Sequence, residues 1–259
     1  MERNCLLEVS GKVAIITINR PPLNTLSRGT LQEINRLLDD IEHNDAVRSI
    51  ILTGSGNQSF SAGADVNEFA AFADPDRAKD TIQHTHNFFR RIELFPKPII
   101  ASVNGRALGG GCELQMACHL VIAAETAEFA LPEVKLGIMP GYGGTQRLPR
   151  LIGRRRALEF ILSGKKVSAE KALEYGLINE VVPSERLMET SLTIAAELAS
   201  GPPIAMKGIL DSVIRGTEMD FEEGIALELN HMLNIARSDD AAEGISAFFT
   251  KRQAQFLGK

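Results

Sequence analysis

Residues 104–117 read Asn-Gly-Arg-Ala-Leu-Gly-Gly-Gly-Cys-Glu-Leu-Gln-Met-Ala, a glycine-rich loop that runs into a short predicted helix. Gly109, Gly110 and Gly111 carry no Cβ, so a ligand can approach their backbone N–H groups closely. The positive end of the helix dipole points at the same place, which suits an anion or a developing oxyanion. Glu113 falls in the first turn of this helix, where its carboxylate can face the same pocket. The same glycines are equally compatible with a tight turn that packs a helix against a strand.

Strand-like segments lie on both sides of this loop. Apolar, β-branched runs at 97–103 and 119–124 flank it, and two similar runs, at 13–18 and 48–53, precede it. Between residues 30 and 43, apolar residues recur at helical spacing with acidic residues between them. Strands that alternate with helices in this way are typical of an α/β fold.

After about residue 140 the pattern becomes mainly helical, with one short strand predicted at 177–182. The predicted helices are 145–152, 154–162, 169–175, 184–198, 203–215, 219–236 and 239–251. Ala199-Ser-Gly-Pro-Pro203 is the best candidate for a hinge, because glycine and proline interrupt regular structure there. We therefore expect a core of residues 1–198 and a C-terminal helical region of residues 199–259.

The composition argues against several classes of protein. The 259 residues include 28 Lys and Arg and 33 Asp and Glu, so the formal net charge is −5. A protein that binds the backbone of a nucleic acid needs a basic face, and no apolar run reaches the length of a membrane span. Three cysteines do not make a disulfide framework, and the N-terminus lacks a targeting pattern. We expect a cytoplasmic protein whose partners include neither nucleic acid nor a membrane.

Phe60-Ser-Ala-Gly-Ala-Asp65 could form a site together with the glycine-rich loop. The small residues at 62–64 let a ligand approach the backbone. One N–H from this segment and one from residues 109–111 would make an oxyanion hole with two donors. The alternative is an ordinary loop in which Asp65 caps a helix that begins near Val66.

Residues 129–145 read Phe-Ala-Leu-Pro-Glu-Val-Lys-Leu-Gly-Ile-Met-Pro-Gly-Tyr-Gly-Gly-Thr and could contribute a second carboxylate, Glu133. Residues 137–144 hold four glycines and one proline, an irregular loop of the kind that shapes functional sites. Taken alone, Glu133 would be interpreted as a solvated carboxylate or a helix cap. Metal-ligand spacing, a P-loop and a dinucleotide fingerprint are all missing, so the sequence predicts no metal and no redox cofactor.

Residues 60–65, 98–113 and 131–148 together resemble the crotonase (enoyl-CoA hydratase/isomerase) superfamily, and the similarity covers essentially the whole chain. The resemblance implies a spiral of ββα units followed by C-terminal helices that build trimers, commonly paired into hexamers. It also implies an acyl-coenzyme A thioester as the substrate. Coenzyme A is then part of the substrate, and no separate cofactor is implied.

The resemblance also assigns roles to individual residues. It places the backbone N–H groups of Ala64 and Gly110 on the thioester oxygen. It places the carboxyl groups of Glu113 and Glu133 on a water molecule that the backbone of Gly141 helps to orient. The remaining contacts that we expect with the substrate or its coenzyme A part are at Ala62, Gly63, Asp65, Gly109 and Lys251, the last reaching the ligand of a neighbouring subunit.

Both glutamates are present, which favours an enoyl-CoA hydratase that adds water syn to a trans-2-enoyl-CoA and gives a 3-hydroxyacyl-CoA. The chain departs from the family at 20–24, which is one residue shorter, at Asn67, where some members have a lysine, and at Ala236, where some have a phenylalanine. Another crotonase reaction, such as isomerisation or hydration of a branched or aromatic-pathway enoyl-CoA, remains an alternative. A non-catalytic scaffold that binds coenzyme A or RNA is a further alternative.

Overall fold

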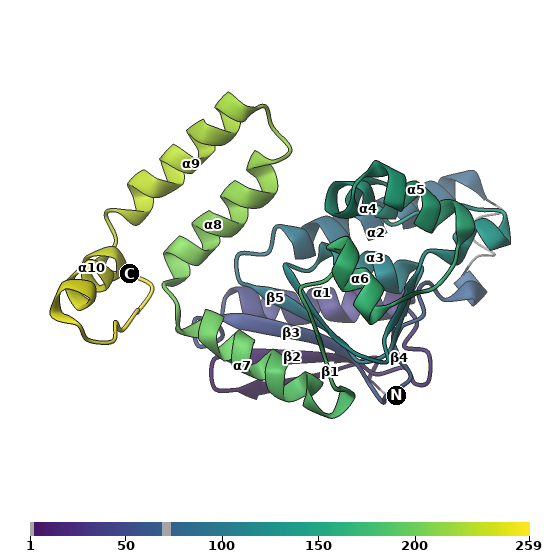
Figure 1. The fold of residues 1–259 in the computed structure, drawn as a ribbon, viewed down its shortest axis with the longest axis horizontal. Helices are drawn as coiled ribbons and strands as arrows, with labels where there is room; N and C mark the ends of the chain where they lie inside the picture. The colour runs from purple at the N-terminus through teal and green to yellow at the C-terminus, as the bar shows by residue number, and fades with distance from the viewer. Residues whose placement is uncertain (1–2, 69–73) are drawn as a thin grey trace.

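A large, mainly parallel sheet forms the base of the computed structural model, which describes residues 3–68 and 74–259 (Figure 1). Its strands lie side by side in the order β1 (Cys5–Ser10), β2 (Val13–Ile18), β3 (Ser49–Gly54), β5 (Ile99–Val103), β7 (Leu120–Ala124) and β10 (Glu180–Val182). The pair β1–β2 is antiparallel and every later pair is parallel. β3 and β5 are buried over their whole length, as expected for strands that are covered on both faces.

A second, smaller sheet lies next to the first. It consists of β4 (Ser59–Ser61), β6 (Arg106–Leu108), β8 (Glu128–Ala130) and β9 (Val167–Ser168). Three times in succession the chain runs from a strand of the large sheet to a strand of the small one: β3 to β4, β5 to β6 and β7 to β8. This repetition is the spiral of ββα units that the resemblance implied, and it confirms the α/β prediction.

Helices follow or cover these strands. They are α1 (Arg28–Glu42), α2 (Pro75–Glu93), α3 (Gly110–Ala117), α4 (Gly144–Ile152), α5 (Arg154–Ser163), α6 (Ala169–Tyr175), α7 (Leu187–Ser200), α8 (Pro203–Gly216), α9 (Phe221–Ile235) and α10 (Asp239–Thr250). Two short 3₁₀ helices, η2 (Pro132–Leu136) and η3 (Ser184–Arg186), join them. Several helices begin where a side chain caps the first turn; Ser27 and Asp74, for example, accept N–H groups at the starts of α1 and α2.

The helix predictions after residue 140 agree with the structure to within three residues at each end. The strand predicted at 177–182 is shorter than expected, because the N–H of Leu177 donates to Ala172 and closes the end of α6. The short strands of the small sheet were not predicted, since two or three residues carry no readable alternation. Residues 66–68 form a single 3₁₀ turn, and the rest of the helix expected there falls on 69–73, outside the described residues.

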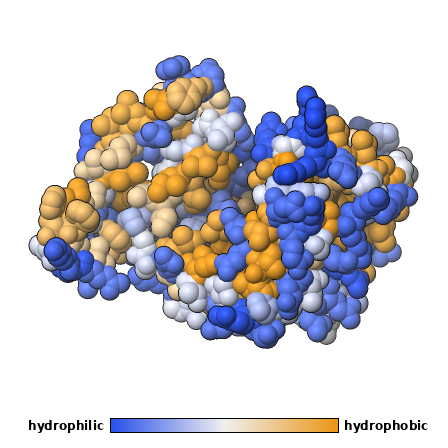
Figure 2. Space-filling view, in the orientation of Figure 1, coloured by the Kyte–Doolittle hydropathy of each residue, from blue (hydrophilic) through white to orange (hydrophobic). Residues whose placement is uncertain are grey.

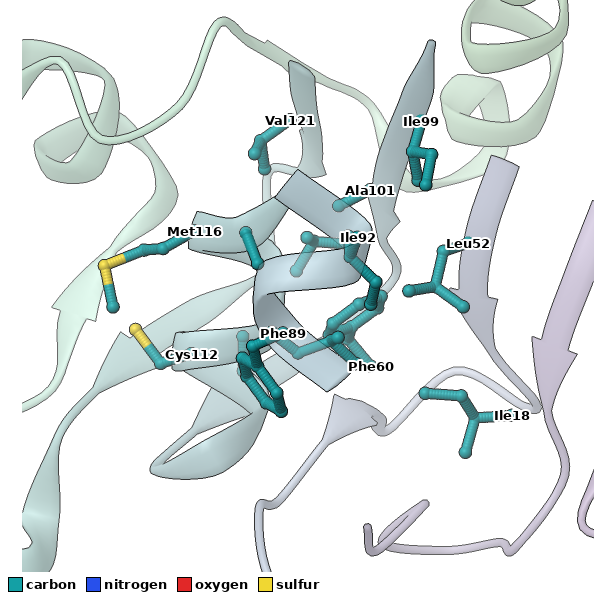
Figure 3. Close-up of a cluster of buried hydrophobic side chains, with 14 of the residues drawn as sticks. Ile18, Leu52, Phe60, Phe89, Ile92, Ile99, Ala101, Cys112, Met116 and Val121 are labelled. Atoms are coloured by element: carbon teal, nitrogen blue, oxygen red, sulfur yellow. The ribbon is translucent and has the colours of Figure 1, made fainter. Parts of the chain in front are cut away.

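The large sheet separates two apolar cores. On one face, side chains from α2, α3 and the strands converge, among them Leu52, Phe60 and Phe89 (Figure 3). On the other face Ile51 and its neighbours pack against α7. Leu52 and Ile51 therefore point to opposite sides, as the two-residue period of a strand requires.

The helices α8, α9 and α10 project from this body as an arm (Figure 1). α7 ends at Ser200 and α8 begins at Pro203, so the junction falls within the predicted hinge. None of the residues of α9 is buried, and apolar side chains lie along the exposed faces of the arm (Figure 2). The division of the chain into two domains at residue 198 stays a prediction.

Gly111 packs directly on the small sheet, which gives a test of the fold. A Cβ at this position would overlap the carbonyl oxygen of Ser61 in β4. We expect Gly111→Ala to lower the free energy of unfolding by about 1–3 kcal/mol, the usual range for an overpacked core, measured by urea unfolding. Gly216→Ala is the matched control, because its Cβ would lie at an ordinary 3.7 Å from Gly224. Equal stability of the two variants would contradict this packing.

Candidate active site

The buried carboxylate of Glu113 is the centre of the site. Glu113 lies in the first turn of α3 and is only 1% exposed. Its Oε1 accepts hydrogen bonds from the backbone N–H groups of Tyr142, at 2.8 Å, and Gly144, at 2.7 Å. Both donors belong to the loop before α4 and the start of that helix, so this irregular loop is folded around the carboxylate.

The surroundings of Glu113 raise its pKa to about 7. Burial is the main cause, because it penalises the charged form. The hydrogen bond from Gly144 opposes this effect, the nearby Glu133 raises the pKa further, and the bond from Tyr142 and the charge of Arg147 lower it. A carboxyl group with a pKa near neutrality can both accept and release a proton under physiological conditions.

Glu133 lies in η2 beside the glycine-rich loop. A Cβ on Gly109 would come within 2.9 Å of Glu133 Oε1, and Gly109 also has a φ of +52°, so two separate constraints favour glycine there. Glu133 Oε2 is buried and has no hydrogen-bond partner within residues 3–68 and 74–259. Burial raises the pKa of Glu133 as well. A buried oxygen without a protein partner is suited to accept a hydrogen bond from a small molecule.

The N–H groups of Ala64 and Gly110 belong to two backbone segments that touch each other. A Cβ on Gly63 would lie 2.9 Å from Gly110 N, and a Cβ on Gly110 would lie 3.4 Å from Ala64 N. The first segment is held in place by the bond from Leu26 N to Gly63 O, at 2.8 Å. Gly110 is the first residue of α3, so its N–H has no carbonyl partner within the helix. The two segments can thus offer two N–H donors to one acceptor.

The loop that carries Gly141 is held from α2. The ring nitrogen Nε2 of His86 lies 2.6 Å from the carbonyl oxygen of Gly141. The ring of Tyr142 packs against Phe89, with 5.7 Å between ring centroids, and against the backbone of Gly110. The sequence assigned no role to His86 or to the N–H donors at 142 and 144, since nothing in the residue types marks backbone donors within an irregular loop.

Of the other residues predicted to contact the substrate, Ala62 and Asp65 lie close to Ala64 in the sequence, whereas Lys251 lies far from α3. The backbone N–H of Ala62, two residues before Ala64, donates to Leu23 O. The backbone N–H of Asn67 and the contact with Arg20, at 3.0 Å, lower the pKa of Asp65. The bond from Asn67 N means that the carboxylate of Asp65 caps the turn at 66–68, which is the alternative that the sequence left open for this residue. Lys251 ends α10 in the projecting arm, and a single chain does not bring it to α3 (Figure 1).

A cavity of about 750 Å³ opens beside Tyr142 between α1 and α2. Leu26, Leu31 and Phe88 supply apolar lining, and polar side chains such as Gln32 and Asn35 supply the rest. The volume is that of a site for a small organic ligand, and Tyr142 links the cavity to Glu113, which its backbone N–H binds.

Two further observations concern the described ranges only. Within them, no three His, Cys, Asp or Glu side chains are grouped in a way that could hold a metal ion. None of the helices described combines the length and the apolar character that crossing a membrane requires.

The sequence model of the family described as enoyl-CoA hydratase/isomerase matches residues 8–259. The chain belongs to this family. It is 42% identical to a short-chain-enoyl-CoA hydratase of Clostridium acetobutylicum over 253 residues, 97% of each chain. It is 42% identical to a probable enoyl-CoA hydratase of Bacillus subtilis over 254 residues, 98% of each chain. The crystal structure of an enoyl-CoA hydratase from Bacillus anthracis superimposes with a TM-score of 0.94 at 38% identity, covering 99% of this chain and 100% of that one.

The raised pKa of Glu113 predicts how its replacement changes stability with pH. The native state holds the proton up to about pH 7, whereas a carboxyl with the ordinary value of 4.5 loses it earlier, so ionisation costs about 3 kcal/mol of stability as pH rises between these values. Gln cannot ionise, so we expect Glu113→Gln to raise the melting temperature relative to the unmodified protein more at pH 8 than at pH 5. Glu228→Gln on the exposed surface of α9 is the control, and a pH-independent effect of Glu113→Gln would contradict the assignment.

Proposed function

We propose that this protein is an enoyl-CoA hydratase that adds water reversibly to a trans-2-enoyl-CoA and gives a 3-hydroxyacyl-CoA. The observation that carries the proposal is the proximity of two carboxyl groups: Glu113 is buried, and Glu133, whose Oε2 is buried, lies close enough to raise the pKa of Glu113. The family relationship and the named relatives support the substrate class, an acyl thioester of coenzyme A. Coenzyme A enters as part of the substrate, and the reaction needs no further cofactor.

The N–H groups of Ala64 and Gly110 bind the thioester oxygen in this proposal. When water adds at C3, electrons move through the double bond and negative charge develops on that oxygen as an enolate. Fixed N–H donors therefore stabilise the transition state more than the bound substrate, which is the requirement for catalysis. The positive end of the α3 dipole acts in the same direction.

In this proposal the two carboxyl groups together bind one water molecule and move its proton. Glu113 Oε1 is already occupied by two N–H donors, so Oε2 is the oxygen that faces the water. One carboxylate takes one proton as the water oxygen bonds to C3, so that a hydroxyl group remains on C3. C2 then receives a single proton, either this one passed on from the water or one from the other carboxyl group, which the proton taken from the water replaces. Oxygen and hydrogen then arrive on the same face of the double bond, and no group other than water is consumed. The backbone at Gly141 helps to orient this water.

The remaining substrate contacts are assigned to Ala62, Gly63, Asp65 and Gly109, which lie in the same two backbone segments as Ala64 and Gly110. Lys251 would contact the coenzyme A part of a substrate bound to a neighbouring copy, because it lies on the projecting arm. Double-bond isomerisation is the nearest alternative and needs only one of the two glutamates. We keep the cytoplasm as the predicted compartment.

We further propose a homo-oligomer, a trimer or a dimer of trimers, built through the arm. Apolar side chains that a single chain leaves exposed include Leu229 at 56%, Met232 at 59% and Phe248 at 79%. Faces of this size and character are typical of subunit interfaces.

Light scattering at micromolar concentration tests this assembly. We expect the mass of three or six chains, and a smaller species for Leu229→Asp, because the charge would be buried in the interface. Glu228→Gln on the same helix should leave the mass unchanged. A monomer formed by the unmodified protein would reject the proposal.

Replacing each glutamate tests the reaction. Glu113→Gln and Glu133→Gln keep size but remove the acid–base group, so each should lower kcat for hydration by about 10²–10⁴-fold with little change in KM. The loss of absorbance of the enoyl thioester, followed over a panel of enoyl-CoA chain lengths, gives activity and substrate preference together.

The double variant should lose far less than the product of the two single effects, since the pair acts on one water. An isomerase would respond asymmetrically: one glutamate would be essential and the other nearly silent. If either single variant keeps hydration within about tenfold of the unmodified protein, the two-carboxylate assignment is wrong.

A further inference from the structure

The loop that binds Glu113 is itself held by an arginine. Arg147, in α4, is only 15% exposed, and its Nη1 donates to the carbonyl oxygen of Tyr142 at 3.0 Å. Gly143 makes this contact possible, because a Cβ there would overlap the guanidinium group. The backbone N–H of Arg147 donates to Gly143 O, at 2.9 Å, as part of the first turn of α4. The side chain of Arg147 therefore reaches back to the residue that precedes its own helix cap.

Arg147 contacts the loop between the two backbone N–H groups that bind Glu113. The carbonyl of Tyr142 belongs to the peptide that joins Tyr142 to Gly143. The two N–H groups that bind Glu113 belong to the peptides immediately before and after it. Holding the middle peptide therefore fixes the orientation of both donors, in a loop of four glycines that has little intrinsic rigidity.

Arg147 is oriented by Glu93, at the end of α2. Nε and Nη2 of Arg147 each lie 3.0 Å from one carboxylate oxygen of Glu93, a planar two-bond pairing that fixes the guanidinium plane. Glu93 is 19% exposed; burial alone would raise its pKa, but Arg147 and then Arg90 outweigh burial and lower it. Arg90 also binds Glu218, beyond α8, and its side-chain hydrogen bonds are to Glu93 and Glu218, not to the loop at 137–144.

We propose that Arg147, oriented by Glu93, is a positioning residue that aims the N–H groups of Tyr142 and Gly144 at the Glu113 carboxylate. Arg147 acts through the loop and does not contact the reacting atoms. The consequence for turnover rests on the proposed hydratase function, whereas the consequence for the ionisation of Glu113 does not.

Titration of Glu113 separates positioning from plain electrostatics. The titratable and charged groups around Glu113 are Glu133 from η2, Tyr142 from the loop, Cys112 from α3 and Arg147 from α4. Removing the negative charge of Glu93 would, by charge alone, lower the pKa of Glu113. Misaligning the two N–H donors would raise it, because these bonds stabilise the carboxylate. The two explanations therefore predict opposite signs for Glu93→Gln.

The experiment follows the carboxyl carbon of Glu113 by ¹³C NMR as a function of pH, in a Glu133→Gln background that removes the coupled glutamate. We expect Glu93→Gln to raise the pKa of Glu113 by about one pH unit, and Arg147→Lys, which keeps the charge but not the paired geometry, to do the same. Arg90→Gln is the matched control, since it removes the other partner of Glu93 and leaves the loop contact intact. A lowered or unchanged pKa in Glu93→Gln would overturn the proposal.

Kinetics of the enzyme with both glutamates present give the second readout. Glu93→Gln and Arg147→Lys should each lower kcat by about tenfold with KM within about twofold, because a misplaced base slows the reaction without loosening the substrate. The double variant should be no slower than the worse single one, and Arg90→Gln should match the unmodified enzyme. Variants whose kcat falls no further than that of Arg90→Gln would contradict the assignment. If the unmodified protein shows no hydration at all, the proposed function fails while the titration still decides this inference.

Discussion

The pair of backbone N–H bonds to the buried carboxylate of Glu113 is the interaction on which the site depends. A carboxylate removed from water is expensive unless donors replace the lost solvation. Tyr142 and Gly144 supply those donors, and the sequence around them is shaped to let them do so. The glycine-rich loop before α3, the irregular loop before α4 and the ion pair behind it all serve one buried group.

The opposing effects of burial and of the N–H donors on the pKa of Glu113 influence both the stability of the protein and the proton transfer at the site. Burial raises the pKa toward neutrality, and the N–H donors limit that rise, so the group can exchange a proton near physiological pH. The same balance costs stability whenever the group is ionised. Within residues 3–68 and 74–259, the buried Oε2 of Glu133 has no hydrogen-bond partner, which is a further cost that a purely structural residue would not carry.

The glycine-rich loop and Glu113 could be predicted from the sequence because three consecutive glycines before a helix have a direct physical meaning. Glu133 could not: alone it resembled a solvated side chain, and only the family resemblance singled it out. The strands of the small sheet were too short to show a period. Arg147 and Glu93 lie 54 residues apart, and no local pattern predicts that a salt bridge between them will hold a loop. The helices after residue 140 were placed well, since their apolar spacing extends over many residues. No bounds were predicted for α2 (Pro75–Glu93), the longest helix of the described ranges.

The central claim is that one water molecule, handled by two carboxyl groups, adds to one face of an enoyl thioester. The stereochemistry of the product tests it most directly. Hydration of a trans-2-enoyl-CoA in D₂O, followed by NMR analysis of the coupling between the C2 and C3 hydrogens, reports whether deuterium and oxygen enter from the same side. The account predicts a single diastereomer, the product of syn addition. An anti product, or a mixture of both diastereomers formed under initial-rate conditions, would contradict it.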